Sequence, residues 1–362
     1  MFDTVLIAGL GLMGGSMAKT IKARTLSRVL GWNRTRATAE QALADGSIDA
    51  IATEALYKEA DLVIIGLYPQ ATVDWLLENM PKMKKGCVIV DMVGVKQFMV
   101  DHLEQAALDA GVHYVGGHPM AGSEKTGYES STDHLLENAY YIITPTKKST
   151  PEQIDRIRQV ALGIGALPIV LDYHEHDFSV AAISHLPHLV ASSLVNLVHD
   201  NDSKDEIMKR LAAGGFKDIT RIASSSPVMW EQICMTNTEN ILVLLKRYIT
   251  SLESICDTLE NHNGDAIYKM FEESGKYRST FPNRGQGPIE RDYSFCVDVL
   301  DEPGSISVLS AILAAKGISV KNIGINHSRE EGEGALRISF YKEDKKNEAA
   351  ELLRSHNYVL TK

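Results

Sequence analysis

The most unusual segment of the sequence is GGHPMAGSEKTGYE, residues 116–129, in which four glycines and one proline surround His118 and Glu124. This composition disfavours a helix or a central strand, so we expect a stiff loop. A histidine held on such a loop can polarise or deprotonate a substrate hydroxyl, and Glu124 would orient a partner or close the entrance. The alternative is a capped turn whose histidine only ties the loop to the core, but the composition and placement of the loop favour chemistry.

A later part of the chain, predicted to be helical, contains histidine and arginine side chains that could contact a substrate. His185 and His188, in the segment ISHLPHL, are three residues apart and share one helix face. No third ligand follows at a fixed spacing, so we expect no metal site, but one histidine in a substrate cleft and the other in core hydrogen bonds. The segment GGFKDITRIASSSPVMW, residues 214–230, places Arg221 after a glycine pair, which suits an anion clamp. A surface ion pair with Asp218 is the alternative.

A glycine-rich turn near the start of the chain follows an apolar run. The run TVLIAGL, residues 4–10, predicts a strand buried on both faces, and GLGLMGGS fits the pattern G-x-G-x-x-G. Between a strand and a helix, the three glycines permit a tight turn, the approach of a pyrophosphate and close packing of helix on strand. The predicted cofactor contacts are Gly9, Gly11, Leu12, Met13 and Gly14.

The end of the second predicted strand, RVLGWN at residues 28–33, bears on the choice of cofactor. An NAD site usually has Asp or Glu there, to accept hydrogen bonds from the ribose. Asn33 carries no charge to repel a 2′-phosphate, and Arg34 and Arg36 could clamp one; as solvated loop charges they would favour neither cofactor. We predict NAD(P), with NADP slightly favoured, bound by Asn33, Arg34 and Thr35.

Strand and helix patterns alternate as far as residue 171. Further buried-strand patterns occur at residues 61–68, 87–92, 112–117, 140–144 and 167–171, and helical spacing at 71–83, 97–111 and 151–163. This alternation predicts a doubly wound, mostly parallel Rossmann-type sheet, and hence a dinucleotide-binding domain over residues 1–171. Ligands bind such sheets beyond the carboxyl ends of the strands, where we expect His118.

The strand patterns stop at residue 172. Residues 172–282 are predicted to form an all-α domain for substrate binding and dimerisation, with one long helix at 177–200 that contains Pro187. Apolar helix faces of this length commonly pair across a twofold axis, so we expect a homodimer. After a linker at 282–289, residues 290–362 show the order β-α-β-β-α-β, which is typical of a ferredoxin-like α+β domain.

The composition limits the class of protein and its partners. A chain of 362 residues suits two or three domains, and the net charge of -10 argues against nucleic acid or an anionic membrane as partner. The four cysteines form no CxxC pair, so neither a zinc site nor a disulfide framework is indicated. The sequence shows no signal-peptide pattern and no apolar run of membrane-spanning length, so we expect a cytoplasmic protein.

Five segments in this order, GLGLMGGS, DMVGVK, GGHPMAGSEKTGYE, ISHLPHL and GFKDITRIASSSPVMW, resemble prephenate dehydrogenases of tyrosine biosynthesis. The resemblance covers residues 1 to about 280, and the tail resembles an ACT domain, an amino-acid-sensing module. It implies oxidative decarboxylation of prephenate to 4-hydroxyphenylpyruvate with hydride transfer to NAD(P). It also implies tyrosine as an effector of the tail, with Gly304 and Asn322 as the candidate contacts.

The resemblance implies roles for the residues of the matching motifs. His118 would be the catalytic histidine, hydrogen-bonded to the ring hydroxyl of the substrate. Arg221 would hold the ring carboxylate, and His188 would contact the substrate. Further residues implied to line or gate the pocket are His185, Glu124 and Trp230.

One position departs from the family pattern. The family often has DxxSxK after the fourth strand, whereas DMVGVK places Gly94 where the serine would be, so Ser123 or a water would have to supply the hydroxyl near His118. Arogenate dehydrogenase, which performs the same chemistry on an amino side chain, is an alternative. A non-catalytic sensor of NADP and amino acids is another, and the departure at Gly94 keeps it open. A β-hydroxyacid dehydrogenase would not explain GGHPMAGSE together with DITRIA.

Overall fold

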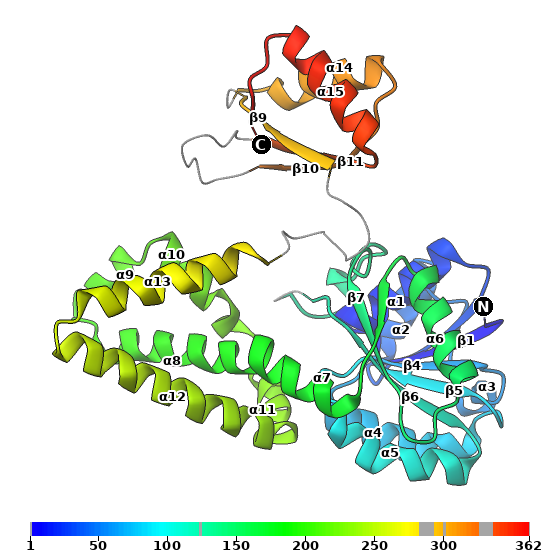
Figure 1. Ribbon diagram of the computed structural model, residues 1–362. Coiled ribbons are helices and arrows are strands. Elements are labelled where there is room, and N and C mark those ends of the chain that lie inside the picture. Colours follow the sequence, from blue (N-terminus) through cyan, green and yellow to red (C-terminus); the bar gives the residue numbers. More distant parts are fainter. Residues whose placement is uncertain (1, 123–124, 282–292, 300–301, 326–335, 362) are drawn as a thin grey trace. The chain divides into compact units, whose positions relative to one another are not determined.

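The structure, a computed structural model, describes residues 2–122, 125–281, 293–299, 302–325 and 336–361 (Figure 1). The chain divides into two compact units, of which the first ends at Phe281 and the second contains the rest. The expected linker at 282–289 lies outside the described residues. The first unit therefore contains both the predicted dinucleotide-binding part and the predicted helical part.

The first unit is built on an eight-stranded sheet in the order β3-β2-β1-β4-β5-β6-β7-β8 (Figure 1). Its neighbouring strands are parallel except for the antiparallel pair β6 and β7. The predicted Rossmann-type sheet is confirmed, while the two-residue strand β3 was not expected. The strands are β1 (Thr4–Ala8), β2 (Arg28–Trp32), β3 (Ala50–Ile51), β4 (Leu62–Ile65), β5 (Val88–Asp91), β6 (His113–Pro119), β7 (Tyr140–Thr144) and β8 (Leu167–Val170).

Helices cover both faces of this sheet (Figure 1). One face packs against α1 (Leu12–Arg24), α2 (Arg36–Ala44) and α6 (Pro151–Gly163). The other packs against α4 (Pro69–Asn79) and α5 (Gln97–Ala110), and the short α3 (Glu54–Tyr57) precedes β4. Because both faces are covered, β4 and β5 are almost continuously apolar, with sequences LVII and VIVD.

Strand β6 continues through residues that the sequence predicted to be a loop. Its antiparallel pairing with β7 runs over Gly116–Pro119, so the strand predicted at 112–117 extends to Pro119 and the loop predicted from residue 116 was wrong for these four residues. A Cβ on Gly117 would lie 2.7 Å from the backbone oxygen of Asp91, and one on Gly116 would overlap Oγ1 of Thr144. These glycines serve close packing in a central strand, which composition alone cannot distinguish from a flexible loop.

After β8, the described part of the first unit is helical, as predicted. The expected helix at 177–200 is continuous but contains a π-helical turn, Ala181–His185, between α7 (Tyr173–Val180) and α8 (Leu186–Asn201). Pro187 has no N–H to donate to the carbonyl of residue 183, and a wider turn accommodates this loss. The helices that follow are α9 (Ile207–Leu211), α10 (Gly214–Thr220), α11 (Pro227–Thr236), α12 (Thr238–Glu260) and α13 (Gly264–Ser279).

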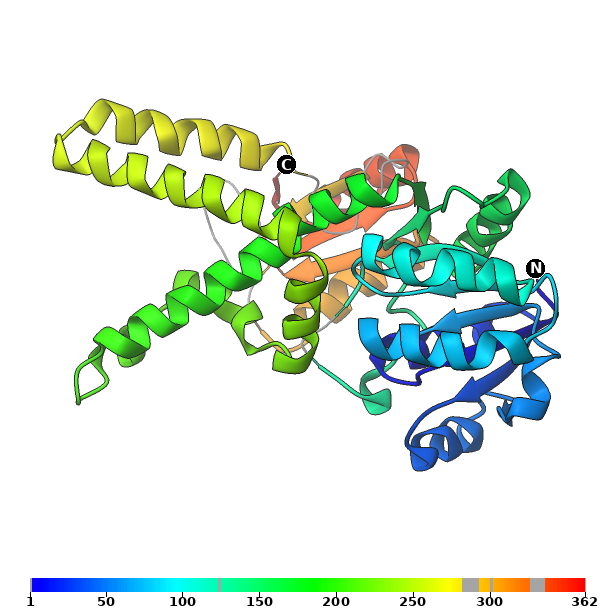
Figure 2. The ribbon, with the colours of Figure 1, turned by 90° about the horizontal axis from the view of Figure 1, so that it is seen from below.

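The segment Tyr173–Asn201 is long and apolar enough to cross a membrane by length and composition. The prediction that no unbroken apolar run reaches this length is not contradicted, because polar residues interrupt the helix throughout. Within the fold, its first part packs on α5 and buries the polar side chains of His176 and Asp177. Seen from below, α8, α12 and α13 extend away from the sheet (Figure 2).

The second unit has a four-stranded antiparallel sheet in the order β10-β11-β9-β12. The predicted element order β-α-β-β-α-β is found, and α14 and α15 pack on the sheet around Leu309, Leu313 and Leu353 (Figure 1). The elements are β9 (Tyr293–Val297), α14 (Ser305–Ala315), β10 (Val320–Ile325), β11 (Leu336–Phe340), α15 (Glu343–Ser355) and β12 (Leu360–Thr361).

Candidate active site

His118 lies at the end of β6, on the edge of the sheet where the parallel strands end, and its side chain is partly exposed. Its Nδ1 is 2.8 Å from Nε2 of His176 in α7, and the two rings meet edge to face. Among the described residues, Nε2 of His118 has no hydrogen-bond partner. The predicted position of this histidine at the ligand edge agrees with the structure, and Nε2 is the atom available to a substrate.

A buried carboxylate continues the contact behind His176. Nδ1 of His176 lies 2.8 Å from Oδ1 of Asp177. The same carboxylate accepts the backbone N–H groups of Lys96 and Gln97, each at 2.8 Å, where α5 begins. A helix N-terminus stabilises a negative charge, so this end of α5 favours the carboxylate form. The hydrogen-bonded chain therefore runs from the start of α5 through two side chains to His118.

The environment keeps the His118 imidazole neutral. Burial lowers the pKa of His118 well below its usual value, and His176, Lys96 and His185 lower it further. A low dielectric penalises the charged form, and the nearby positive charge of Lys96 opposes a second one. At neutral pH the ring is therefore unprotonated at one nitrogen and can accept a proton from a hydroxyl group.

A buried ion pair lies next to this chain, behind β6. Lys96 and Asp91 are completely buried and pair through Nζ and Oδ1, and Tyr114 donates its hydroxyl hydrogen to Oδ2 of Asp91 at 2.5 Å. Burial lowers the pKa of Lys96 against the opposing effect of Asp91, and burial together with Asp91 raises the pKa of Tyr114. Such a pair is costly to break, so it fixes the turn between β5 and α5 that carries Gly94.

His185 belongs to the core. It is 2% exposed, and its Nδ1 lies 3.1 Å from Nδ2 of Asn237, which also donates to the backbone oxygen of Asp177 at 2.8 Å. Burial lowers the pKa of His185 to about 4, although Asp177 opposes the shift. These contacts fit the prediction that one of the two histidines makes hydrogen bonds in the core.

His188 and Trp230 form a half-buried aromatic wall. Their rings stack with centroids 3.6 Å apart, and Trp230 also meets His185 edge to face at 5.9 Å. Nδ1 of His188 donates to the backbone oxygen of Ser184 at 2.8 Å. The indole Nε1 of Trp230 is buried without a hydrogen-bond partner among the described residues, so it is available to a polar ligand.

Arg221 lies near this wall. It is exposed and begins the 3₁₀ turn Arg221–Ser224, which follows α10. Burial lowers the pKa of His188, and the positive charge of Arg221 contributes to that shift. The glycine pair expected to interrupt a helix instead begins one, because α10 starts at Gly214. That His118 and Arg221 meet around one substrate remains a prediction.

The turn between β1 and α1 has the geometry that a pyrophosphate requires. Gly9 has φ +95°, and a Cβ there would lie 2.6 Å from the backbone oxygen of Gly66. At Gly11, where α1 begins, a Cβ would meet open space, and at Gly14 it would overlap the carbonyl oxygen of Gly9. The three glycines thus serve the turn, the open approach and the close packing predicted for them. The first residues of α1, Leu12 and Met13, present backbone N–H groups at this opening.

The residues at the end of β2 brace this loop. Oδ1 of Asn33 accepts the backbone N–H of Leu10 at 3.0 Å, and Nδ2 donates to the backbone oxygen of Thr35 at 3.1 Å. Arg36 pairs with Glu40 at 2.8 Å on the surface, while Arg34 is exposed. Of the two predicted phosphate clamps, Arg36 therefore has a competing partner.

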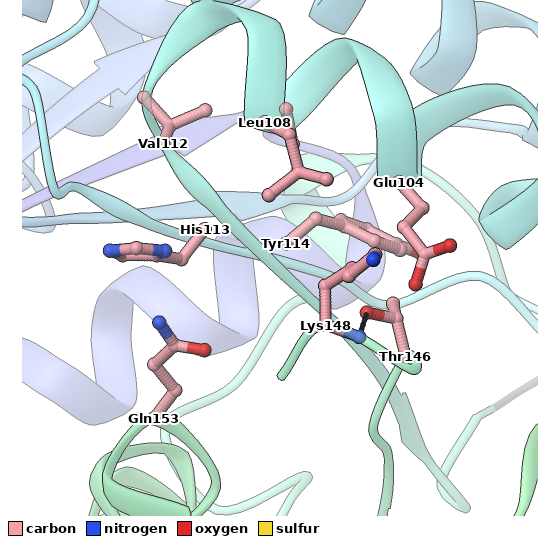
Figure 3. Close-up of a pocket in the computed structure, with 9 residues that line it drawn as sticks. Glu104, Leu108, Val112, His113, Tyr114, Thr146, Lys148 and Gln153 are labelled. Atoms are coloured by element: carbon pink, nitrogen blue, oxygen red, sulfur yellow. Dashed lines mark hydrogen bonds between the residues drawn. The ribbon is translucent and has the colours of Figure 1, made fainter. Parts of the chain in front are cut away.

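A small pocket lies apart from this site, near the beginning of β6 (Figure 3). It is lined by the end of α5, by His113 and Tyr114 of β6, and by residues 146–153. His113 and His118 occupy opposite ends of β6, so this pocket is not part of the candidate active site. Among the described residues, no cluster of three or more His, Cys, Asp or Glu side chains could hold a metal ion.

Both parts of the first unit match known protein families. Residues 17–170 match the model of the prephenate dehydrogenase nucleotide-binding domain, and residues 172–273 match that of the prephenate dehydrogenase dimerization domain. The chain belongs to the prephenate dehydrogenase family. It is 39% identical to the prephenate dehydrogenase of Bacillus subtilis over 98% of this chain and 96% of that protein.

Solved structures of the family share the fold of the first unit. The prephenate dehydrogenase from A. aeolicus, in complex with hydroxyphenyl propionate and NAD+, matches with a TM-score of 0.72 and 29% identity, covering 77% of this chain and 98% of that chain. The Synechocystis arogenate dehydrogenase matches with a TM-score of 0.68 and 25% identity, covering 77% of this chain and all of that chain. Residues 17–170 of this family member thus form a nucleotide-binding domain, and the A. aeolicus relative holds NAD+ in its complex.

The departure from the family motif at Gly94 lies beside the candidate base. A Cβ on Gly94 would be 3.6 Å from both Nε2 and Cε1 of His118, which is ordinary contact distance. A serine at this position would thus place its hydroxyl near the ring. Ser123, the candidate substitute, and Glu124, the predicted gate, lie outside the described residues.

The sequence analysis missed His176, Asp177 and Asn237. All three are buried polar residues in or beside otherwise apolar helices. A buried polar side chain needs a partner, so the pair His176 and Asp177 at the start of an apolar helix was a signal that could have been used. Asn237 gave no comparable signal, because it lies at a helix junction, where asparagine is common.

Proposed function

We propose that the chain oxidises and decarboxylates prephenate to 4-hydroxyphenylpyruvate while a hydride passes to NAD(P). The observation that carries this proposal is the neutral His118, with Nε2 open to a ligand, on the edge of a sheet that also carries a pyrophosphate-binding loop. Membership of the prephenate dehydrogenase family supports the choice of substrate.

The chemistry needs a base and an anion site. Nε2 of His118 accepts the proton of the ring hydroxyl as the C–H bond at that carbon breaks. A bound NAD(P) would supply the hydride acceptor for this step. The ring carboxylate then leaves as CO₂, and its bonding electrons complete the aromatic ring. Because aromatisation supplies the driving force, the protein's task is to position the substrate and remove the hydroxyl proton.

The helical part supplies the substrate contacts in this proposal. Arg221 holds the ring carboxylate, since a guanidinium can bind a carboxylate through two hydrogen bonds. His188 and Trp230 form the wall against which the ring packs, and the free indole N–H of Trp230 can donate to a substrate oxygen. His185 supports this wall from the core. The predicted roles of Glu124 as a gate and of Ser123 as a source of the hydroxyl near His118 belong to the same proposal.

Cofactor preference belongs to the same proposal. The side chain at position 33 is uncharged, which tolerates a 2′-phosphate, and the exposed Arg34 can approach one. We propose that NADP is slightly favoured and that Thr35 completes the contact. Asn33 acts mainly by holding the glycine loop to the end of β2, as its hydrogen bonds to Leu10 and Thr35 indicate.

The exposed apolar surface of the helical part bears on how the protein assembles. Large apolar side chains on the helices from α8 onward are more than half exposed, namely Leu197, Leu211, Ile219, Val228, Met235, Leu259, Tyr268, Phe271 and Tyr277. Exposed apolar surface of this extent is characteristic of protein interfaces, which supports a homodimer formed through the helical part. The proposed place of action is the cytoplasm, where small-molecule biosynthesis occurs.

The second unit is proposed to be an ACT domain that binds tyrosine. Its element order and strand order are those expected for a ferredoxin-like fold. Gly304 begins α14 with φ +98°, and Asn322 lies at a register shift in β10. The N-terminus of α14 can accept a carboxylate, and the exposed Asn322 amide can hydrogen-bond an amino acid.

The deciding experiment is an assay of four combinations, in which prephenate and arogenate are each supplied with NAD and with NADP. Reduced nicotinamide is followed by its absorbance. Turnover of prephenate supports the proposal, and exclusive turnover of arogenate would instead establish the activity named for the Synechocystis relative. Tight NADP binding with neither substrate oxidised would establish the non-catalytic sensor.

A further inference from the structure

We propose that His176 and Asp177 are positioning residues that fix the tautomer of His118, with the proton on Nδ1 and the lone pair on Nε2. The consequence for catalysis rests on the proposed function, but the tautomer itself does not. The observation that carries the inference is the continuous chain of hydrogen bonds from the start of α5 to the imidazole of His118.

The direction of the chain is set at its buried end. Asp177 already accepts two backbone N–H groups at the N-terminus of α5, which favours the ionised form. A carboxylate can only accept, so Nδ1 of His176 must carry the proton that it shares with Oδ1. In a neutral His176 the lone pair is then on Nε2, which faces Nδ1 of His118 at 2.8 Å.

The tautomer of His118 follows from that of His176. Facing a lone pair on His176, Nδ1 of His118 must be the donor, and the neutral ring then has its lone pair on Nε2. The opposite tautomer would set two lone pairs against each other in a buried site and leave both without a donor. When Nε2 takes up a proton, the imidazolium still donates from Nδ1, and Asp177 stabilises its charge through His176.

No other described contact can fix the ring from the substrate side. Gly94 is the neighbour of Nε2, and it offers no hydroxyl group. Three charged or titratable groups face these hydrogen bonds. They are Lys96 from the turn before α5, its partner Asp91 of β5, and His185 from the π-helical turn. Lys96 and His185 lower the pKa of His118 but, within the described part of the chain, do not hydrogen-bond to it. With glycine at position 94, the tautomer depends on His176.

The direct test is the tautomeric state of His118 in the wild-type chain at pH 7.5, without substrate. Long-range ¹H–¹⁵N correlation spectra of ¹⁵N-histidine-labelled protein distinguish a protonated ring nitrogen from an unprotonated one, and the signals that disappear in His118→Asn identify this residue. We expect protonated Nδ1 and unprotonated Nε2. Protonation at Nε2 instead would overturn the proposal, whether or not the chain oxidises prephenate and whether or not any position-176 variant folds.

Three variants test the consequence for turnover. His176→Leu removes the hydrogen-bond acceptor and fills its place with an apolar side chain of similar size. It should lower kcat by about 10²-fold with little change in KM, because general-base function is lost. His176→Gln can still donate to Asp177 and accept from His118, so it should recover at least about tenfold of that loss. His174→Leu removes an exposed histidine from the same helix and should leave kcat unchanged.

The spectra of the same variants separate positioning from structural support. In His176→Leu, His118 should lose its Nδ1–H tautomer, and in His176→Gln it should keep it. A variant that loses turnover while its His118 spectrum is unchanged would show that His176 only supports the fold, and this outcome would overturn the proposal. If wild-type protein shows the expected tautomer but no oxidation of prephenate, the proposed function fails while the positioning role stands.

Discussion

At the scale of single residues, His118 must be neutral when the substrate arrives, and its neighbours provide this. Burial, His176, Lys96 and His185 all act in the same direction on its pKa. A residue of the same type on the surface would be partly charged near pH 6.5. The polar cluster around His118 therefore has an electrostatic function besides its hydrogen bonds.

The pH dependence of catalysis should reflect this lowered pKa. Because the neutral form of His118 persists to lower pH, kcat/KM should stay nearly constant from pH 8 to pH 6 and fall only in more acidic solution. The measurement is kcat/KM for prephenate across pH 5 to 8, which reports groups of the free enzyme. A fall centred at or above the ordinary histidine value of about 6.5 would contradict the assignment.

Replacement of the base tests its role directly. His118→Asn keeps a polar side chain of similar size but removes the group that accepts the proton. We expect kcat to fall by roughly 10²–10⁴-fold while prephenate still binds. Steady-state kinetics and a binding titration measure the two effects, and near-normal turnover would exclude His118 as the base.

Arg221 should affect binding rather than turnover. Loss of a charged partner of the ring carboxylate typically costs roughly 2–5 kcal/mol, so Arg221→Ala should raise the KM for prephenate by about 30-fold or more. Arg247→Ala, a change to another arginine of the helical part, is the control. An unchanged KM in Arg221→Ala would place the anion clamp elsewhere.

At the scale of elements, the close packing of β6 against its neighbours determines which glycines can be replaced. Gly117→Ala would place a Cβ 2.7 Å from the backbone oxygen of Asp91, so we expect the free energy of unfolding to fall by roughly 1–3 kcal/mol. Gly94→Ala has its nearest neighbours at 3.6 Å and no positive φ, so it should be neutral or stabilise by about 0.4–1 kcal/mol.

Urea denaturation of both variants measures this difference. Equal stability of the two variants would show that β6 does not pack against β5 as closely as the structure indicates. A second element, the π-helical turn at Ala181–His185, ends at His185, which is buried and meets Trp230 edge to face. His188, in the α-helix that follows, stacks on the same indole ring.

At the scale of the whole molecule, the two compact units divide the proposed catalysis from the proposed control. We expect tyrosine to inhibit the full-length chain, with a change of about 5–150-fold in apparent affinity for prephenate, the usual range of coupling between sites. The measurement is a tyrosine titration of prephenate oxidation. A chain that ends at residue 281 should oxidise prephenate and should not respond to tyrosine. In the full-length chain, Asn322→Ala should be inhibited by tyrosine more weakly than wild type.

Two results would contradict the regulatory role. Equal sensitivity of the full-length and shortened chains would place the tyrosine site in the first unit. Insensitivity of both would leave the second unit with a role in assembly, which comparison of the two chains by light scattering would reveal.

Much of this protein is determined by sequence alone, because its signals are local. The apolar runs and the glycines at 9, 11 and 14 predict the sheet and its phosphate-binding turn, since turn geometry and strand burial depend on nearby residues. The histidine at 118 could be identified for the same reason, from an unusual composition at the end of a strand. The element order of the second unit was equally visible.

The tertiary structure decided what depends on residues far apart in the chain. Residues 116–119 form a strand because they pair with β7, and the glycines at 116 and 117 are needed there because Thr144 and Asp91, from two other strands, leave no space for a Cβ. His176 lies 58 positions after His118 and 80 after Lys96, yet packing of α7 against α5 joins the three groups through Asp177. Sequence periodicity shows which face of a helix is apolar but not which helix packs against it. The hydrogen bonds from α5 through Asp177 and His176 to His118 are therefore visible only in the tertiary structure.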